Sequence, residues 1–248
     1  MKLTWLGHAT VVIDTAGGRL VTDPLLRSRV AHLRRHAAPV RAPEKVDVVL
    51  LSHLHYDHLD VPSLRKLKAP VVAPPGSERT LQRLHLEVSE LAAGEQIAVG
   101  GAEVTAVRAV HDGRRSPLAG RRDDDSIGYL VEGDDQRVYF AGDTEVFAGM
   151  QDFGPLDAAL VPIWGWGPRL GPGHMDPSQA AEALTLLRPA VAVPIHWGTF
   201  LPIGGYRRHH DLLHTPVEQF RLRAAELAPD VRIEVLDPGG SLVITQRG

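Results

Sequence analysis

The alternation of hydrophobic and polar positions near the N-terminus predicts short antiparallel strands. We expect three of them, over residues 2–6, 11–14 and 19–22. Gly17 and Gly18 supply a favoured hairpin turn between the second and third strands. Residues 46–51 form a nearly continuous hydrophobic run, which is typical of a strand that is buried on both faces. This run leads directly into a segment that is rich in histidine.

Helices and strands alternate in the middle of the chain. Pro62 and Ser77 are plausible helix starts, and Gly100 with Gly101 marks a second hairpin turn. In chain order we expect a helix over 62–68, a strand over 71–73, a helix over 77–84, strands over 97–99 and 103–110, and a polar loop over 112–125.

The second half of the chain continues this alternation. We expect strands over 127–132, 138–141, 158–162, 191–195, 232–236 and 241–245, with helices over 177–187 and 215–227. Two strand-rich halves, each closed by helices, predict two mixed β-sheets face to face with helices outside, a four-layer αββα sandwich of the α/β (α+β) class. No segment is long and flexible enough to separate the halves, so we expect a single domain over residues 1–248.

Composition and charge are those of an ordinary globular protein, with 44% hydrophobic and 23% charged residues. The net charge of −3 gives no general attraction to polyanions, so no obligate nucleic-acid partner is expected. No hydrophobic run approaches the roughly 20 residues that span a bilayer, and residues 1–10 lack the features of a signal peptide. We therefore expect a cytoplasmic protein without a transmembrane segment, and the sequence leaves homo-oligomerisation open.

The strongest chemical signal is the segment that follows the hydrophobic run at 46–51. His53, His55, Asp57 and His58 place three imidazoles and one carboxylate within six positions. The chain has no cysteine, so any metal must be held by such histidine and carboxylate donors, which are the usual zinc ligands when thiolates are missing. A solvated polar loop is the alternative, but the density of donors and their position at a strand end favour a metal site.

The pattern His-x-His-x-Asp-His after a hydrophobic strand closely resembles the signature of the metallo-β-lactamase superfamily. This resemblance implies a metallo-β-lactamase sandwich with a later histidine, a bridging aspartate and a final histidine, each at the end of a strand. His111, Asp143 and His196 occupy those positions in the expected order. The resemblance implies that one metal is held by His53, His55 and His111, the other by Asp57, His58 and His196, with Asp143 between them. Taken alone, Asp143 would fit a turn or helix-cap residue equally well.

Shorter motifs at 5–10, 22–24 and 52–59 look like those of the subgroup that contains N-acyl phosphatidylethanolamine phospholipase D and ascorbate-6-phosphate lactonase. His174, just before a predicted helix, resembles a family position near the substrate. We take it as a candidate proton-handling residue and, with Asp57, as a candidate catalytic residue; packing at the helix start is the alternative for His174. His8 either approaches the metal centre or only bonds the sheet, and Asp23 either orients a ligating histidine or serves a turn.

The implied chemistry is metal-dependent hydrolysis. Two divalent ions, zinc first, with manganese or iron as alternatives, would generate a bound hydroxide that attacks a phosphodiester or an ester or lactone bond. Three segments are basic, 27–41, 114–122 and 207–214. If they converge on the metals, they favour a small anionic substrate, phosphorylated or lipid-like. The alternative is that they are solvated surface. Trp164 and Trp166 either line the site or pack in the core, and we expect His32, His36, His85, His209, His210 and His214 at the surface.

Three other functions stay open. A small nuclease acting on RNA or DNA is compatible with the donor set, although the net charge does not favour it. Iron-dependent redox chemistry is known in related proteins, but the diiron reductases usually carry Glu at the position of His55 and a flavin domain that this chain lacks. The third alternative is a non-catalytic metal-binding module. Metal uptake without turnover of any ester or phosphodiester substrate would favour this alternative.

Overall fold

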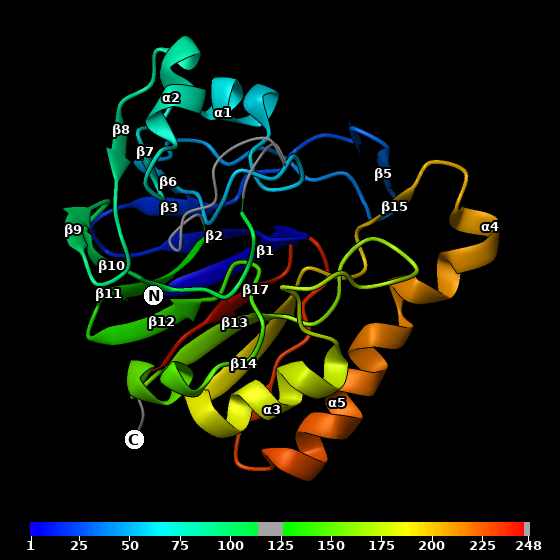
Figure 1. Cartoon of the computed structure of the whole chain (residues 1–248). Helices are drawn as coiled ribbons and strands as arrows, with labels where there is room; N and C mark the ends of the chain where they lie inside the picture. Colours follow the sequence, from blue (N-terminus) through cyan, green and yellow to red (C-terminus); the bar gives the residue numbers. More distant parts are fainter. Residues whose placement is uncertain (114–125, 246–248) are drawn as a thin grey trace.

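Two seven-stranded β-sheets form the centre of the computed structural model, which describes residues 1–113 and 126–245 (Figure 1). The sheets lie face to face, with α1 (Val61–Leu67) and α2 (Glu78–Leu81) over the outer face of one. Helices α3 (Pro177–Leu187) and α5 (Thr215–Leu227) cover the outer face of the other. The predicted αββα sandwich is therefore confirmed.

The first sheet is built from the N-terminal strands and the last strand of the chain. Its order is β17-β1-β2-β3-β6-β7-β8, antiparallel from β17 to β3 and parallel from β3 to β8. The strands are β1 (Lys2–Gly7), β2 (Thr10–Asp14), β3 (Arg19–Thr22), β6 (Val48–Leu50), β7 (Val71–Ala73), β8 (Val88–Glu90) and β17 (Ser241–Val243). The predicted antiparallel start and the buried strand before the histidines are both present, whereas β8 was not predicted.

The second sheet contains the remaining predicted strands. Its order is β16-β14-β13-β12-β11-β10-β9, antiparallel from β9 to β12 and parallel from β12 to β16. The strands are β9 (Gln96–Val99), β10 (Ala102–Arg108), β11 (Ile127–Gly133), β12 (Gln136–Phe140), β13 (Ala158–Pro162), β14 (Val191–Ile195) and β16 (Arg232–Ile233). Both sheets are thus mixed, as predicted, and Gly100 and Gly101 form the β9–β10 turn with positive φ angles.

Two of the helices, α1 and α3, begin at side chains that cap their first turns. Asp60 accepts a hydrogen bond from Ser63 N–H at the start of α1, and Asp176 with Gln179 forms a capping box at the start of α3. The predicted helix over 77–84 is shorter than expected, because α2 ends at Leu81 and continues as the 3₁₀-helix η1 (Gln82–Leu84). Within the described ranges, no helix is long and apolar enough to cross a bilayer.

A third, three-stranded sheet lies beside the sandwich and was not predicted. Its order is β15 (Phe200–Pro202), β5 (Leu33–Arg35), β4 (Arg29–Val30). Two of its strands lie in the basic segment 27–41, where strands of two or three residues leave no alternation to detect. Two further short elements, α4 (Tyr206–His209) and η3 (His210–Leu213), connect this sheet to α5. The predicted loop over 112–125 lies almost entirely outside the described residues.

The core between the two sheets is continuous and joins the layers tightly. Trp5 of β1 stacks on Trp197, which follows β14, with ring centroids 5.5 Å apart. Tyr139 and Phe140 of β12 are fully buried in the same cluster. The candidate histidines follow strand ends of both sheets, with His53 after β6 of the first sheet and His111 and His196 after β10 and β14 of the second.

Candidate metal centre

The histidine-rich segment folds into a tight turn directly after β6. The N–H groups of His58 and Leu59 both donate to the carbonyl of His55, at 3.1 and 2.8 Å. The turn places His53 and His55 in one group of donors and Asp57 and His58 in another. His53 and His58 are fully buried, whereas the Asp57 side chain is 14% exposed.

A first group of donors consists of His53, His55 and His111, whose nitrogen atoms lie within 4.8 Å of one another. His111 follows β10, and its Nε2 lies 3.1 Å from His55 Nδ1. His111 Nδ1 donates to the carbonyl of Gly173, at 2.8 Å. A carbonyl can only accept, so Nδ1 carries the hydrogen and the Nε2 lone pair of His111 points at His55.

A second group of donors consists of Asp57, His58 and His196, with His8 beside them. His58 Nε2 and His196 Nε2 lie 3.1 Å apart. His58 Nδ1 is 2.7 Å from an oxygen of Asp23, and His196 Nδ1 donates to the carbonyl of Trp164 at 2.8 Å.

Asp143, which follows β12, lies between the two groups. Its Oδ1 is 3.2 Å from His196 Nε2, and its Oδ2 is 3.2 Å from His58 Nε2 and 3.9 Å from His53 Nε2. The carboxylate is 1% exposed. The structure thus brings together all seven residues predicted as metal ligands, with Asp143 in the position expected of a bridge.

The buried donors are short of hydrogen-bond partners in a way that fits bound cations. Within the described residues, neither His53 Nε2 nor Asp143 Oδ1 has a hydrogen-bond partner. A buried polar atom left unpaired costs about 1–3 kcal/mol. Imidazole nitrogens and carboxylate oxygens that converge in this way form a donor set that suits divalent zinc, manganese or iron. The residues present therefore fit the metals that the sequence predicts.

Burial keeps most of these histidines neutral. It lowers the pKa of His196 to about 3 and that of His111 to about 4, and it lowers the pKa of His53 well below its usual range. His58 differs. Burial lowers its pKa, but the carboxylates of Asp143, Asp23 and Asp57 outweigh burial and raise the pKa well above its ordinary value. The outcome is a site of neutral donors with one imidazole that holds a proton in the absence of metal.

The two candidate carboxylate ligands stay ionised. Burial alone would raise the pKa of Asp143, but His196 and His58 outweigh it and hold the pKa well below its usual range. For Asp57, burial also raises the pKa, but the neighbouring His58 and the hydrogen bond from His8 outweigh burial and hold the pKa well below its usual range. Both side chains can therefore offer anionic oxygens to a cation.

Comparison with known proteins agrees with this geometry. The model of a β-lactamase superfamily domain matches residues 18–197, a range that includes all seven candidate ligands. A UPF0173 metal-dependent hydrolase of Methanopyrus kandleri is 33% identical over 97% of this chain and 99% of its own length. The chain belongs to the UPF0173 metal-dependent hydrolases of the β-lactamase superfamily. The superfamily predicted from the sequence is thereby confirmed.

Two further matches place this hydrolase among its relatives. An N-acyl-phosphatidylethanolamine-hydrolyzing phospholipase D of Caenorhabditis elegans is 31% identical over 81% of this chain and 64% of its own length. The solved structure of Igni18, a metallo hydrolase from Ignicoccus hospitalis, superposes with a TM-score of 0.73 at 24% identity and covers 97% of both chains. The second likeness shows the shared fold.

Asp23 of the hydrolase orients one histidine in each donor group. Its Oδ2 accepts a hydrogen bond from Ser52 Oγ at 2.6 Å and contacts His58 Nδ1. Since the hydroxyl hydrogen of Ser52 is committed to Asp23, Ser52 Oγ accepts from His53 Nδ1, 2.9 Å away. Of the two interpretations left open for Asp23, the structure therefore favours orientation of ligating histidines.

His174 lies against Asp143 on the open side of the centre. Its Nε2 is 3.3 Å from Asp143 Oδ2, and its side chain is 24% exposed. Burial lowers the pKa of His174, but the hydrogen bond and charge of Asp143 raise it more, to about 9. The preceding Gly173 has φ +80°, and a Cβ there would lie 2.6 Å from His111 Nδ1, so only glycine fits.

The two tryptophans left open by the sequence differ in their contacts. Trp166 Nε1 donates to Asp57 Oδ2 at 3.0 Å, whereas Trp164 contributes its backbone carbonyl to His196. His32 is exposed, as predicted, and packs edge-on against Trp166 with ring centroids 4.7 Å apart. No feature of the sequence distinguishes Trp166 from Trp164, because the contact with Asp57 depends on chain segments more than 100 residues apart.

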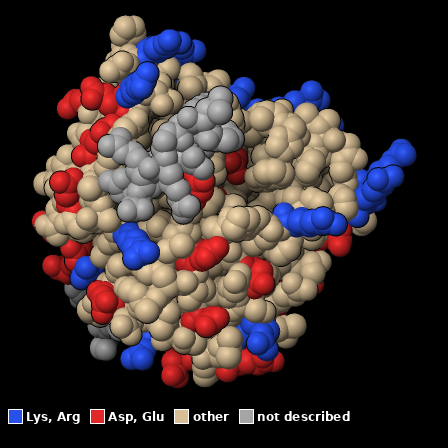
Figure 2. Space-filling model, viewed as in Figure 1, with Lys and Arg blue, Asp and Glu red and all other residues tan. Residues whose placement is uncertain are grey.

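The basic segments are only partly available to a substrate. Arg27 forms a forked pair with the buried Asp60, and Arg41 pairs with Glu44 at 3.2 Å. Arg34 and the α4 residues Arg207 and Arg208 are exposed, while segment 114–122 lies outside the described residues. On the face shown in Figure 2, basic and acidic side chains are interspersed, with no broad basic patch among the residues drawn in colour.

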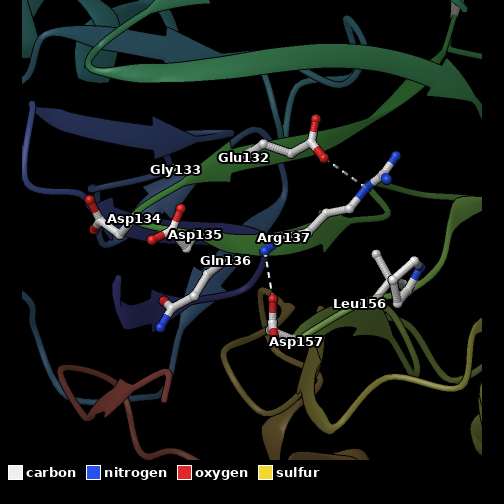
Figure 3. A pocket seen from close by; sticks show the side chains of 9 residues that line it. Glu132, Gly133, Asp134, Asp135, Gln136, Arg137, Leu156 and Asp157 are labelled. Atoms are coloured by element: carbon white, nitrogen blue, oxygen red, sulfur yellow. Dashed lines mark hydrogen bonds and ion pairs between the residues drawn. The ribbon is translucent and has the colours of Figure 1, made fainter. Parts of the chain in front are cut away.

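A surface pocket of about 730 Å³ lies away from this centre, beside the β11–β12 turn. Figure 3 shows Glu132 paired with Arg137, and Asp157 accepting the backbone N–H of Arg137. None of the candidate metal ligands lines this pocket. The histidine centre is therefore the candidate functional site.

Proposed function

We propose that the protein is a hydrolase with two divalent metal ions, zinc first, that cleaves a phosphodiester or an ester or lactone bond of a small anionic substrate. The observation that carries the proposal is Asp143, ionised and buried between two groups of converging donors. One ion would be held by His53, His55 and His111, the other by Asp57, His58 and His196, with Asp143 shared. Manganese and iron accept the same donors.

When bound, such a pair of ions lowers the pKa of a shared water and stabilises charge on the attacked group. The chain contributes the orientation of the donors. The carbonyls of Gly173 and Trp164 accept the Nδ1 hydrogens of His111 and His196 and keep their Nε2 lone pairs inward. Because the ions would supply the activated water, no serine or cysteine nucleophile would be needed.

We assign His174 the transfer of a proton to the leaving group. Its Nδ1 lies 3.1 Å from the carbonyl of Pro172, so the ring is held with Nε2 toward Asp143 and the open side of the centre. With a pKa raised to about 9, the ring carries a proton on Nε2 at neutral pH. Asp57, ionised and partly exposed, is the second proposed catalytic residue and orients the attacking water as a hydrogen-bond acceptor.

The substrate class rests on two supports. The Caenorhabditis elegans relative is named for hydrolysis of a phospholipid, which supports a phosphodiester in a phosphorylated or lipid-like molecule. The exposed Arg34, Arg207 and Arg208 lie on the small sheet and on α4, and suit an anionic group. We place this activity in a cytoplasmic enzyme with one domain over residues 1–248.

Hydrolysis by the metal-reconstituted protein tests the proposal. We expect turnover of bis(p-nitrophenyl) phosphate or of members of a lactone panel, and the preferred compound then decides between phosphodiesterase and lactonase. Asp143→Asn removes the shared charge but keeps the shape, and should lower kcat at least 100-fold, a barrier increase of about 2.7 kcal/mol. A protein that holds its metals but turns over no member of either panel would contradict the proposal.

A further inference from the structure

His8 is a buried histidine beside the second donor group, and the proposed reaction gives it no role. It lies in the turn between β1 and β2 and is 1% exposed. Its Nε2 is 3.1 Å from Asp57 Oδ2. Its ring packs on that of His196, with centroids 3.9 Å apart. The ring is therefore placed against the centre and not only against the sheet.

The backbone of His8 is held in an unfavourable conformation by three hydrogen bonds. Its φ of 55° lies in the left-handed region, which non-glycine residues rarely adopt. The His8 N–H donates to Thr199 Oγ1 at 2.8 Å, and its carbonyl accepts from His196 N–H at 2.9 Å and from Trp5 Nε1 at 2.8 Å. Such strain persists only where the surroundings fix it, and it concentrates at functional positions.

The small sheet supports His8 from behind. Gly7 has φ +105°, and a Cβ there would lie 2.7 Å from Arg35 Nη2, which donates to the Leu6 carbonyl. The Arg35 guanidinium lies over the ring of Phe200, and that ring meets His8 edge-on at 5.6 Å. The unpredicted third sheet thus fixes the position of the His8 ring.

The same oxygen of Asp57 has a second donor from a different part of the chain. Trp166 Nε1 donates to Asp57 Oδ2 at 3.0 Å. This oxygen also lies 3.8 Å from the Nε2 atoms of His58 and His196. Two donors that approach one carboxylate oxygen from separate segments restrict its torsion angles, and so fix how it faces the two histidines.

We propose that His8 and Trp166 are positioning residues that hold the Asp57 carboxylate against His58 and His196 and thereby set the affinity of the second metal. This inference rests on the proposed dinuclear centre. A carboxylate only accepts hydrogen bonds, so His8 keeps its hydrogen on Nε2 and acts as a donor, not as a fourth ligand. Trp166 has one ring hydrogen and can act only as a donor.

The test compares metal binding by the wild type, His8→Ala, His8→Gln, Trp166→Phe and the surface control His210→Ala. Zinc affinity is measured by competition with a chromophoric chelator, and metal per chain after dialysis. We expect His8→Ala and Trp166→Phe to weaken the second metal about 10- to 100-fold and to leave the first unchanged. His8→Gln, whose amide can donate at the same place, should recover most of the loss, and His210→Ala should match the wild type.

Each outcome decides the inference. Wild-type affinity in both His8→Ala and Trp166→Phe would overturn it while leaving the proposed hydrolase intact. A His8→Gln protein that binds the second metal as weakly as His8→Ala, with an altered cobalt absorption spectrum, would show that His8 is a ligand and would overturn it too. A wild type that binds no metal overturns both. Trp166→Phe keeps an aromatic ring and removes only the indole N–H donor. If circular dichroism shows that His8→Ala is misfolded, the metal affinity of Trp166→Phe therefore tests the inference.

Discussion

The Nε2 atoms of His58 and His196 lie 3.1 Å apart, although the Nδ1 atoms of both rings already face acceptors. Two neutral imidazoles in this arrangement would direct lone pairs at each other. Without metal, a proton on His58 relieves the conflict, and the surrounding carboxylates favour that proton because their charges raise the pKa of His58 well above its ordinary value. The same positive charge can come from a metal ion, so metal and proton compete for one position.

Metal binding should therefore release a proton near neutral pH. The pKa of His58 is raised above its unfolded value of about 6.5, so its protonated form stabilises the metal-free fold below that pH, and this stabilisation is lost as pH rises. Metal affinity should change in the opposite direction and increase with pH. Calorimetric titration with zinc at pH 7, in two buffers of different ionisation enthalpy, measures the proton. Equal heats in both buffers would contradict this competition.

Asp23→Asn should weaken metal binding without unfolding the protein. The amide keeps the shape of Asp23 but has only one acceptor oxygen, whereas the carboxylate accepts from Ser52 N–H with Oδ1 and from Ser52 Oγ and His58 Nδ1 with Oδ2. Loss of such an orienting contact typically weakens metal affinity about 10- to 100-fold. Chelator competition measures it, with the exposed Asp230→Asn as control. An Asp23→Asn protein with unchanged affinity would show that the carboxylate only supports the turn.

Gly173→Ala should disrupt the first donor group. Alanine is strained at φ +80°, and its Cβ would collide with the His111 ring. We expect hydrolysis to fall at least tenfold and the metal held with His53 and His55 to bind more weakly. The matched control is Gly171→Ala, two residues earlier, where a Cβ meets no atom within 4 Å. Equal activity of the two variants would contradict the proposed constraint.

His174→Gln should lower kcat while both metals stay bound. The ring touches Asp143 but belongs to neither proposed ligand set, so metal content should match the wild type. His174 has a raised pKa of about 9, so its acid form is present below that pH and is lost above it. Bound cations lower this value, so the wild-type rate should fall with pH at or below 9. A pH–rate profile checks this, and an unchanged alkaline limb in His174→Gln would exclude the proton transfer.

Strong periodicity was enough to predict most of the sandwich. The strands β13 and β14 and the helices α3 and α5 begin and end where hydrophobic pattern and helix starts predicted them. His111, Asp143 and His196 each come shortly after a strand, but only the resemblance to the metallo-β-lactamase superfamily distinguished them as candidate ligands. Local pattern therefore predicted the fold, and the resemblance predicted the composition of the centre.

The remaining features depend on contacts that no local pattern encodes. The small sheet pairs Phe200 with Arg35, residues 165 positions apart, and its strands are too short to show alternation. Trp166 reaches Asp57 and His8 reaches the same oxygen only after both sheets have closed. Gly7 and Gly173 are required by close approaches that become visible only in three dimensions.

Elemental analysis of the purified protein after reconstitution, with Asp143→Asn beside the wild type, tests the central claim most directly. Two divalent ions per wild-type chain are predicted, because two donor groups share the Asp143 carboxylate. Asp143→Asn should lose at least one of them while keeping the circular dichroism spectrum of the wild type. A wild type that takes up no metal, or an Asp143→Asn protein that holds both ions as tightly as the wild type, would contradict the account.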